Sequence, residues 1–273
     1  MALRSPRRKT RDNPDGRMPL REHLQELRNR VFFSAVAVLL GAVVGWFLYE
    51  PLIEALKEPL DEVSERRGSL ATLNYGDIAS PFNLKLKLSL YLGIVIACPV
   101  WLYQIWAFIV PGLTGKEKRN ALAFVAAAVP LFISGLTLAW FVLPNAVHFL
   151  TEFTPDGAVN IVSADAYLTF VTRIMLAFGV AFVVPLFLVA VNAVGLVSAA
   201  TLARGWRVAV FLAFLFAAVA SPSPDAGSMI ALAVPIVALY FIALGVACVI
   251  DRRRARRAAD ALRDLPDDQA RPL

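Results

Sequence analysis

The 273-residue chain has few charged residues and very few of the residues that bind metals or form disulfides. Only 18% of its residues are charged and 58% are hydrophobic, which is unlike the composition of a soluble domain. The two histidines, His23 and His148, are too widely separated for a usual metal cluster. The two cysteines, Cys98 and Cys248, both lie inside apolar runs, which favours buried thiols over a disulfide.

Motifs of common enzyme classes are also missing. The chain has no HExxH, GxSxG, P-loop or GxGxxG pattern, which would supply a zinc site, a serine nucleophile or a phosphate-binding loop. No pair of acidic residues within the apolar runs suggests an aspartyl protease or a proton relay. We therefore predict no catalytic residue, no metal and no cofactor, and a membrane enzyme is the weakest interpretation.

Long apolar runs, in contrast, are plentiful, and a bilayer span needs about 20 such residues. The runs predict helices at 31–49, 81–110, 121–149, 167–194, 206–220 and 229–250. The fifth is short for a span, which predicts bilayer thinning or contact with partners, and Pro185 favours a bend in the fourth. The predicted fold class is an all-α polytopic membrane protein with six transmembrane helices.

The polar ends of the chain divide it into three parts. Residues 1–18 are rich in Arg, Pro, Asp and Asn and predict a disordered basic tail. From Pro19 an amphipathic helix leads into the first span, so the membrane domain is expected at 19–254. Residues 255–273 are expected to form a disordered cytoplasmic tail.

Basic residues gather at alternate ends of the predicted helices. Beyond those of the N-terminal segment, they are Lys116, Lys118, Arg119, Arg204, Arg207, Arg252, Arg253, Arg254, Arg256 and Arg257. Because cytoplasmic loops are enriched in Lys and Arg, we expect a multi-pass protein of the cell membrane with both termini in the cytoplasm. Anionic lipid explains the net charge of +6 better than nucleic acid does.

Small residues at Gly41 and Gly45 have the spacing that lets two helices approach closely. The contact is either internal packing, which we favour, or an interface between subunits.

Two acidic residues, Glu26 and Glu117, lie in segments that are otherwise basic. By spacing alone, each is best explained by local pairing, Glu26 with Arg30 four residues on and Glu117 with an adjacent lysine. The alternative is a site for a cationic ligand, because carboxylates bind guanidinium groups through paired hydrogen bonds.

Five segments together resemble the TatC family of the twin-arginine protein translocase, over residues 18 to 254. They read HLQELRNR at 23–30, DIASPF at 77–82, YQIWAFIVPGLTGKEKR at 103–119, FGVAFVVP at 178–185 and SPSPD at 221–225. The resemblance implies a signal-peptide receptor and core subunit that exports folded proteins across the inner membrane, driven by the proton-motive force.

The resemblance also assigns residues. It implies that Glu26 and Glu117 recognise the paired arginines of a signal peptide, which shifts the interpretation of the two glutamates from pairing toward binding. Arg28 and Phe108 match the basic and aromatic residues of the same motifs and complete the implied signal-peptide-binding set. Further positions that match family motifs are Pro59, Asp77 and Asp225.

The resemblance implies partners as well: single-span TatA- and TatB-like subunits around the last two helices, twin-arginine precursors, and further copies of the chain. Two positions depart from the family pattern, since Val183 and Met229 stand where the family often has Glu and Gln. We therefore expect a more apolar docking of the single-span subunits. A secondary transporter of a small solute remains the alternative, although neither internal repeats nor midplane polar residues favour it.

Overall fold

The structure is a computed structural model that describes residues 20–67, 72–109, 115–152, 161–220 and 226–263. Within these residues nearly all of the chain is helical. The elements are α1 (Leu20–Phe47), α2 (Tyr49–Arg67), β1 (Thr72–Asn74), α3 (Ser80–Ile96), α4 (Cys98–Ile109), α5 (Gly115–Glu152), β2 (Ile161–Ser163), α6 (Ala164–Val194), α7 (Ala199–Arg204), α8 (Trp206–Ala220) and α9 (Ala226–Arg263).

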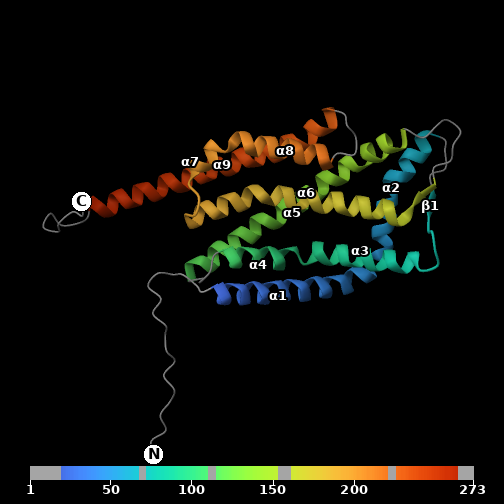
Figure 1. Cartoon of the computed structure of the whole chain (residues 1–273), viewed down its shortest axis with the longest axis horizontal. Helices are drawn as coiled ribbons and strands as arrows, with labels where there is room; N and C mark the ends of the chain where they lie inside the picture. The colour runs from blue at the N-terminus through green and yellow to red at the C-terminus, as the bar shows by residue number, and fades with distance from the viewer. Residues whose placement is uncertain (1–19, 68–71, 110–114, 153–160, 221–225, 264–273) are drawn as a thin grey trace, which may run out of the picture.

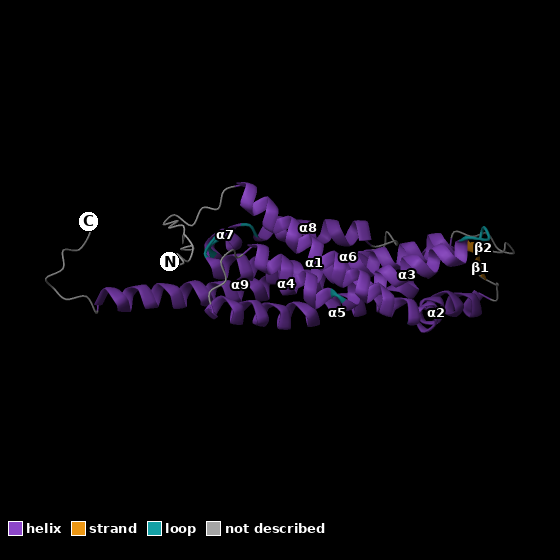
Figure 2. Ribbon diagram, turned by 90° about the horizontal axis from the view of Figure 1, so that it is seen from below, coloured by secondary structure: helices purple, strands orange, loops and turns teal. Residues whose placement is uncertain are grey.

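The long helices run side by side in a layered bundle (Figure 1). α1 packs on α3 and α4, α4 packs on α5, α5 on α6, α6 on α9, and α9 on α8. One end of the bundle holds the start of α1, the end of α4 and α7, and we call it the α7 end. The opposite end, which holds α2 and β1, is the β1 end; Figure 2 shows the same arrangement from below.

The predicted all-α class is confirmed. Four helices are long and apolar enough to cross a membrane, α3 with α4 forms a bent fifth candidate, and α8 is a shorter apolar helix. The predicted short run at 206–220 coincides with α8, and Pro185 lies inside α6, which runs unbroken.

The predicted helix at 81–110 is wrong as a single element, because it breaks at Ala97 with a bend of 58°. Pro99 has no N–H to donate to the carbonyl four residues earlier, and its ring clashes there. At the same break, the indole Nε1 of Trp101 donates to the carbonyl of Ile94, at 2.9 Å. The break therefore leaves a helix-end carbonyl that a side chain satisfies.

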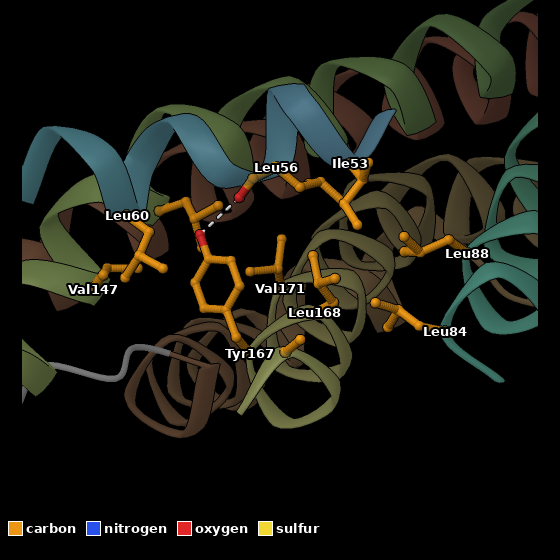
Figure 3. Close-up of a cluster of buried hydrophobic side chains, with 11 residues drawn as sticks. Ile53, Leu56, Leu60, Leu84, Leu88, Val147, Tyr167, Leu168 and Val171 are labelled. Atoms are coloured by element: carbon orange, nitrogen blue, oxygen red, sulfur yellow. Dashed lines mark hydrogen bonds between the residues drawn. The ribbon is translucent and has the colours of Figure 1, made fainter. Parts of the chain in front are cut away.

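The β1 end carries structure that the sequence did not predict. The segment after α1, expected as a loop, folds as α2, and β1 and β2 pair in parallel with Leu73 opposite Val162. Ile53, Leu56 and Leu60 of α2 are buried against Leu168 and neighbouring side chains (Figure 3). Burial of this apolar face explains why a segment rich in acids is helical.

Internal packing explains the glycine pair of α1. A Cβ on Gly41 would lie 2.9 Å from the Gly93 carbonyl oxygen of α3, and one on Gly45 would lie 2.6 Å from that of Ser89. The expected internal contact is therefore confirmed for both positions.

The end of α9 differs from expectation. Residues 255–263, assigned from the sequence to a disordered tail, continue the helix, as good helix formers such as Ala and Arg allow. The expected tail at 1–18 lies outside the described residues.

Candidate functional site

One face of α1 presents polar side chains to α4 at the α7 end. His23, Glu26 and Arg30 are spaced by three and four residues, which places them on one side of the helix. The apolar side chains of the same amphipathic segment are exposed: Leu24 and Val31 are 60% and 58% exposed. In the first turns of α1 the polar face thus meets the protein and the apolar face is open.

Glu26 and Arg30 form an ion pair, so the local pairing that the spacing favours is confirmed. Nε of Arg30 donates to Oε1 of Glu26 at 3.0 Å, and Nη2 donates to the same oxygen. Nη1 donates to Oε1 of Gln104 on α4, at 3.3 Å. The side chains of Arg30 and Glu26 are 19% and 22% exposed, so solvent still reaches the pair.

An aromatic stack forms the next contact between the same helices. The ring of His23 lies against that of Phe108, with centroids 4.5 Å apart and the planes 21° from parallel. Phe108 and Gln104 are four residues apart, so both belong to the face of α4 that meets α1. Glu26 and Phe108, named from the resemblance, are therefore brought into one α1–α4 junction.

The junction includes residues that the site prediction missed. Gln104 and Arg30 complete the polar chain, and His23 completes the stack. The four-residue spacing from Glu26 to Arg30 was the sequence signal that could have placed Arg30 in the site. Nothing in the local sequence of either helix gives the register of α4 against α1.

Arg28 does not join the junction. It is exposed, and residues two apart on a helix point to different sides. Glu117 lies in the first turn of α5, which begins at the α7 end (Figure 1). Its side chain is outside the described part of the structure.

The remaining family-motif positions lie away from the junction. Pro59 belongs to α2, at the β1 end. Asp77 is exposed in the turn before α3, where its backbone carbonyl accepts from the Ser80 N–H at 3.3 Å. Asp225 falls outside the described residues. The structure thus separates the predicted positions between the two ends of the bundle.

A wide apolar groove runs between α6 and α8, with a volume of about 920 Å³. Its walls include Val180 and Val184 of α6 and Leu212 of α8, and Tyr240 of α9 contributes a polar group. Val183, which stands where the family often has Glu, is 2% exposed and packs in a cluster with Phe132. The Val183 side chain therefore faces the core and does not line the groove.

A buried polar cluster joins α6, α7 and α9 and was not predicted. The fully buried Asn192 donates to Oδ1 of Asp251 at 3.0 Å and to the Val197 carbonyl at 2.9 Å. The second oxygen of Asp251 accepts the Ala199 N–H at 2.7 Å, at the start of α7. The cluster fixes the short connection between α6 and α8, and so one end of the groove.

Comparisons with known proteins find similar sequences along most of the chain. Residues 22–235 match the family model described as Sec-independent protein translocase protein (TatC). The chain is 54% identical over 245 residues to a Sec-independent protein translocase protein TatC of Xylanimonas cellulosilytica, covering 90% of this chain and 89% of that protein. A TatC of Frankia casuarinae is 42% identical, with 97% and 76% covered.

A solved structure is similar as well. The crystal structure of the twin-arginine translocase receptor TatC superposes with a TM-score of 0.67 at 32% identity, covering 82% of this chain and 99% of that one. The chain therefore belongs to the TatC family of Sec-independent protein translocase proteins.

Proposed function

We propose that this chain is the signal-peptide receptor and core subunit of a twin-arginine translocase, which exports folded proteins across the cell membrane with the proton-motive force. Family membership over most of the chain supports this function and gives no support to a secondary transporter. Both termini then lie in the cytoplasm, with the α7 end facing inward, an orientation that the distribution of basic residues supports.

The observation that carries the proposal is the α1–α4 junction at the α7 end, in which Glu26 holds a guanidinium group and Phe108 stacks on His23. Oε1 of Glu26 already accepts two guanidinium N–H groups from Arg30, which supports a role in binding a guanidinium ligand. A signal peptide brings two guanidinium groups, and Glu117, in the first turn of α5, supplies the second carboxylate. Recognition is binding and involves no bond chemistry.

The apolar part of a signal peptide needs an apolar surface beside this site. Val31, Phe32 and Leu39 of α1 are 58%, 64% and 61% exposed, and they follow the polar junction along the helix. An arriving apolar helix that lies along α1 therefore keeps its arginines at the α7 end.

The single-span TatA- and TatB-like subunits are proposed to dock in the α6–α8 groove. Its lining is almost entirely apolar, which fits the expectation of more apolar docking. α8 has only 15 residues, so a partner helix alongside it also relieves the mismatch with the bilayer. Several copies of the chain within one translocase are part of the proposal.

The test replaces Glu26 by Gln, which keeps the shape and removes the charge. Hydrogen bonds to charged groups contribute about 1.5–3 kcal/mol, so binding of a twin-arginine signal peptide is expected to weaken by about tenfold or more. Photocrosslinking in membranes that contain a twin-arginine precursor measures the contact, from position 117 when residue 26 is varied and from position 26 when residue 117 is varied.

The matched control is Asp260→Asn, which removes an exposed carboxylate from α9 near the same end of the bundle. Binding of the signal peptide by this variant is expected to equal that of the unaltered chain. Equal crosslinking in Glu26→Gln, Glu117→Gln and the unaltered chain would show that the arginines are recognised elsewhere.

A further inference from the structure

The carboxylate proposed to receive a signal-peptide arginine already holds a guanidinium of its own chain. Arg30 places two of its nitrogens on Oε1 of Glu26 and the third on Gln104. Both members of the pair are partly exposed, so an incoming guanidinium can reach them from solvent. Internal and external cations therefore compete for one acceptor.

We infer that Arg30 is a specificity-determining residue, an internal stand-in for the arginine of the ligand that must leave Glu26 before the signal peptide binds. This inference rests on the proposed function, because it assumes that Glu26 is part of the receptor site. It assigns Arg30 and Gln104 distinct roles: Arg30 competes with the ligand, and Gln104 holds Arg30 after its release.

The contact with Gln104 gives the displaced side chain a place to go. Nη1 of Arg30 lies 3.3 Å from the Gln104 amide oxygen, and this contact does not involve Glu26. The backbone of Arg30 is fixed separately, since its carbonyl accepts from the Ser34 hydroxyl at 3.0 Å. A rotation of the guanidinium about this anchor releases Glu26 without breaking the α1–α4 junction.

Competition explains why the ligand must carry guanidinium groups, and more than one of them. The first arginine only replaces Arg30, so one guanidinium is exchanged for another with little net gain. The second arginine, which binds Glu117, supplies the net gain in binding free energy. An ammonium group lacks the planar fork that presents two N–H groups in one direction, so lysine is at a disadvantage against Arg30.

A purely positioning role for Arg30 makes the opposite prediction. If Arg30 served only to orient Glu26, its removal would leave the carboxylate misplaced and weaken ligand binding. If Arg30 competes, its removal frees the carboxylate and strengthens binding. The sign of the change therefore separates the two roles.

The experiment measures binding of fluorescent signal peptides with Arg-Arg or Lys-Lys to the purified full chain in detergent. We expect Arg30→Gln to bind the Arg-Arg peptide about twofold to fivefold more tightly, as loss of a partly exposed ion pair implies. The preference for Arg-Arg over Lys-Lys should shrink. Arg21→Gln, which removes an exposed charge from the same helix, controls for net charge. It should change neither the affinity for the Arg-Arg peptide nor the preference over Lys-Lys.

Arg30→Lys provides a second variant that keeps the positive charge for folding. A single ammonium is a weaker competitor, so a smaller shift in the same direction is expected. Weaker or unchanged Arg-Arg binding in the Arg30 variants would overturn the inference. Glu26→Gln in the same assay separates the two proposals: if it has no effect, the receptor site itself is wrong, and if it abolishes binding without any gain in the Arg30 variants, only the competition is wrong.

Discussion

The α1–α3 interface and the α6–α8 interface are built in opposite ways. In the first, Gly41 and Gly93 bring two backbones so close that a Cβ on Gly93 would lie 2.4 Å from the Val38 carbonyl oxygen. In the second, α6 and α8 leave a groove of about 920 Å³ between them, and α8 packs instead on α9. The same chain contains one closed and one open helix contact.

The difference shows how helices associate where water does not drive them together. Lipid solvates an apolar side chain as well as another helix does. Tight contacts therefore need small residues, which let two backbones approach closely and gain van der Waals contact. Glycine supplies this on α1 and α3. Val180, Val184 and Leu212 line the space between α6 and α8, where a helix from another subunit could pack.

The closed interface predicts the largest mutational effect. Gly93→Val places its side chain against the Val38 carbonyl and the Ala42 backbone of α1, neither of which can move without shifting the helix. Overpacking costs about 1–3 kcal/mol and more where backbone is in the way. We expect loss of the folded protein, measured as yield in size-exclusion chromatography.

The control is Gly245→Val in α9, where no heavy atom other than those of the adjoining backbone of α9 lies within 4 Å of the added Cβ. This variant should elute like the unaltered chain. A folded Gly93→Val protein with unchanged thermal stability would contradict the close contact between α1 and α3.

The open interface predicts an intermediate effect that appears in assembly and not in folding. Leu212→Trp fills part of the groove, and its side chain is 54% exposed, so stability should change by about 0.5 kcal/mol or less. Crosslinking of single-span subunits to α8 should fall several-fold, because the larger side chain takes up space reserved for the partner helix.

Leu215→Trp is the matched control on the same helix, since Leu215 is 47% exposed and is not part of the groove lining. An equal loss of crosslinking in both variants would mean that partners contact the outer face of α8 and leave the groove empty.

The sequence predicted the elements whose signals are local. Apolar runs predicted the long helices, and four-residue spacing predicted the pairing of Glu26 with Arg30. Pro99 was a local signal too, and the break it causes between α3 and α4 was readable from its missing N–H. The helix α2 was not predicted, because its sequence is rich in acids and its apolar face is buried against a residue distant in the sequence, Tyr167.

Contacts between distant segments were not accessible in the same way. The pairing of β1 with β2, the stack of His23 on Phe108 and the link from Arg30 to Gln104 all depend on helix register. Register follows from packing of whole helices and not from the residues at one contact. The candidate site was therefore predicted in part by spacing and in part by family resemblance. The contacts made by Gln104 and His23 became visible only in the structure.

The smallest effect on assembly is expected at Tyr240, which lines the groove. The hydroxyl of Tyr240 on α9 donates to the carbonyl of Leu202 on α7, at 2.7 Å, and ties the start of α8 to α9. Tyr240→Phe removes this bond and keeps the ring, so the expected cost is about 1 kcal/mol. Thermal unfolding in detergent should detect a small decrease in melting temperature.

Tyr103→Phe in α4 is the control, since the described structure gives that hydroxyl no hydrogen bond and the residue is 38% exposed. If the groove depends on α7 being held in place, Tyr240→Phe should also reduce crosslinking of single-span subunits slightly, while Gly245→Val should not. A lower melting temperature with full crosslinking would mean that α8 keeps its position without this bond. In that case the buried cluster of Asn192 and Asp251 alone fixes the open interface.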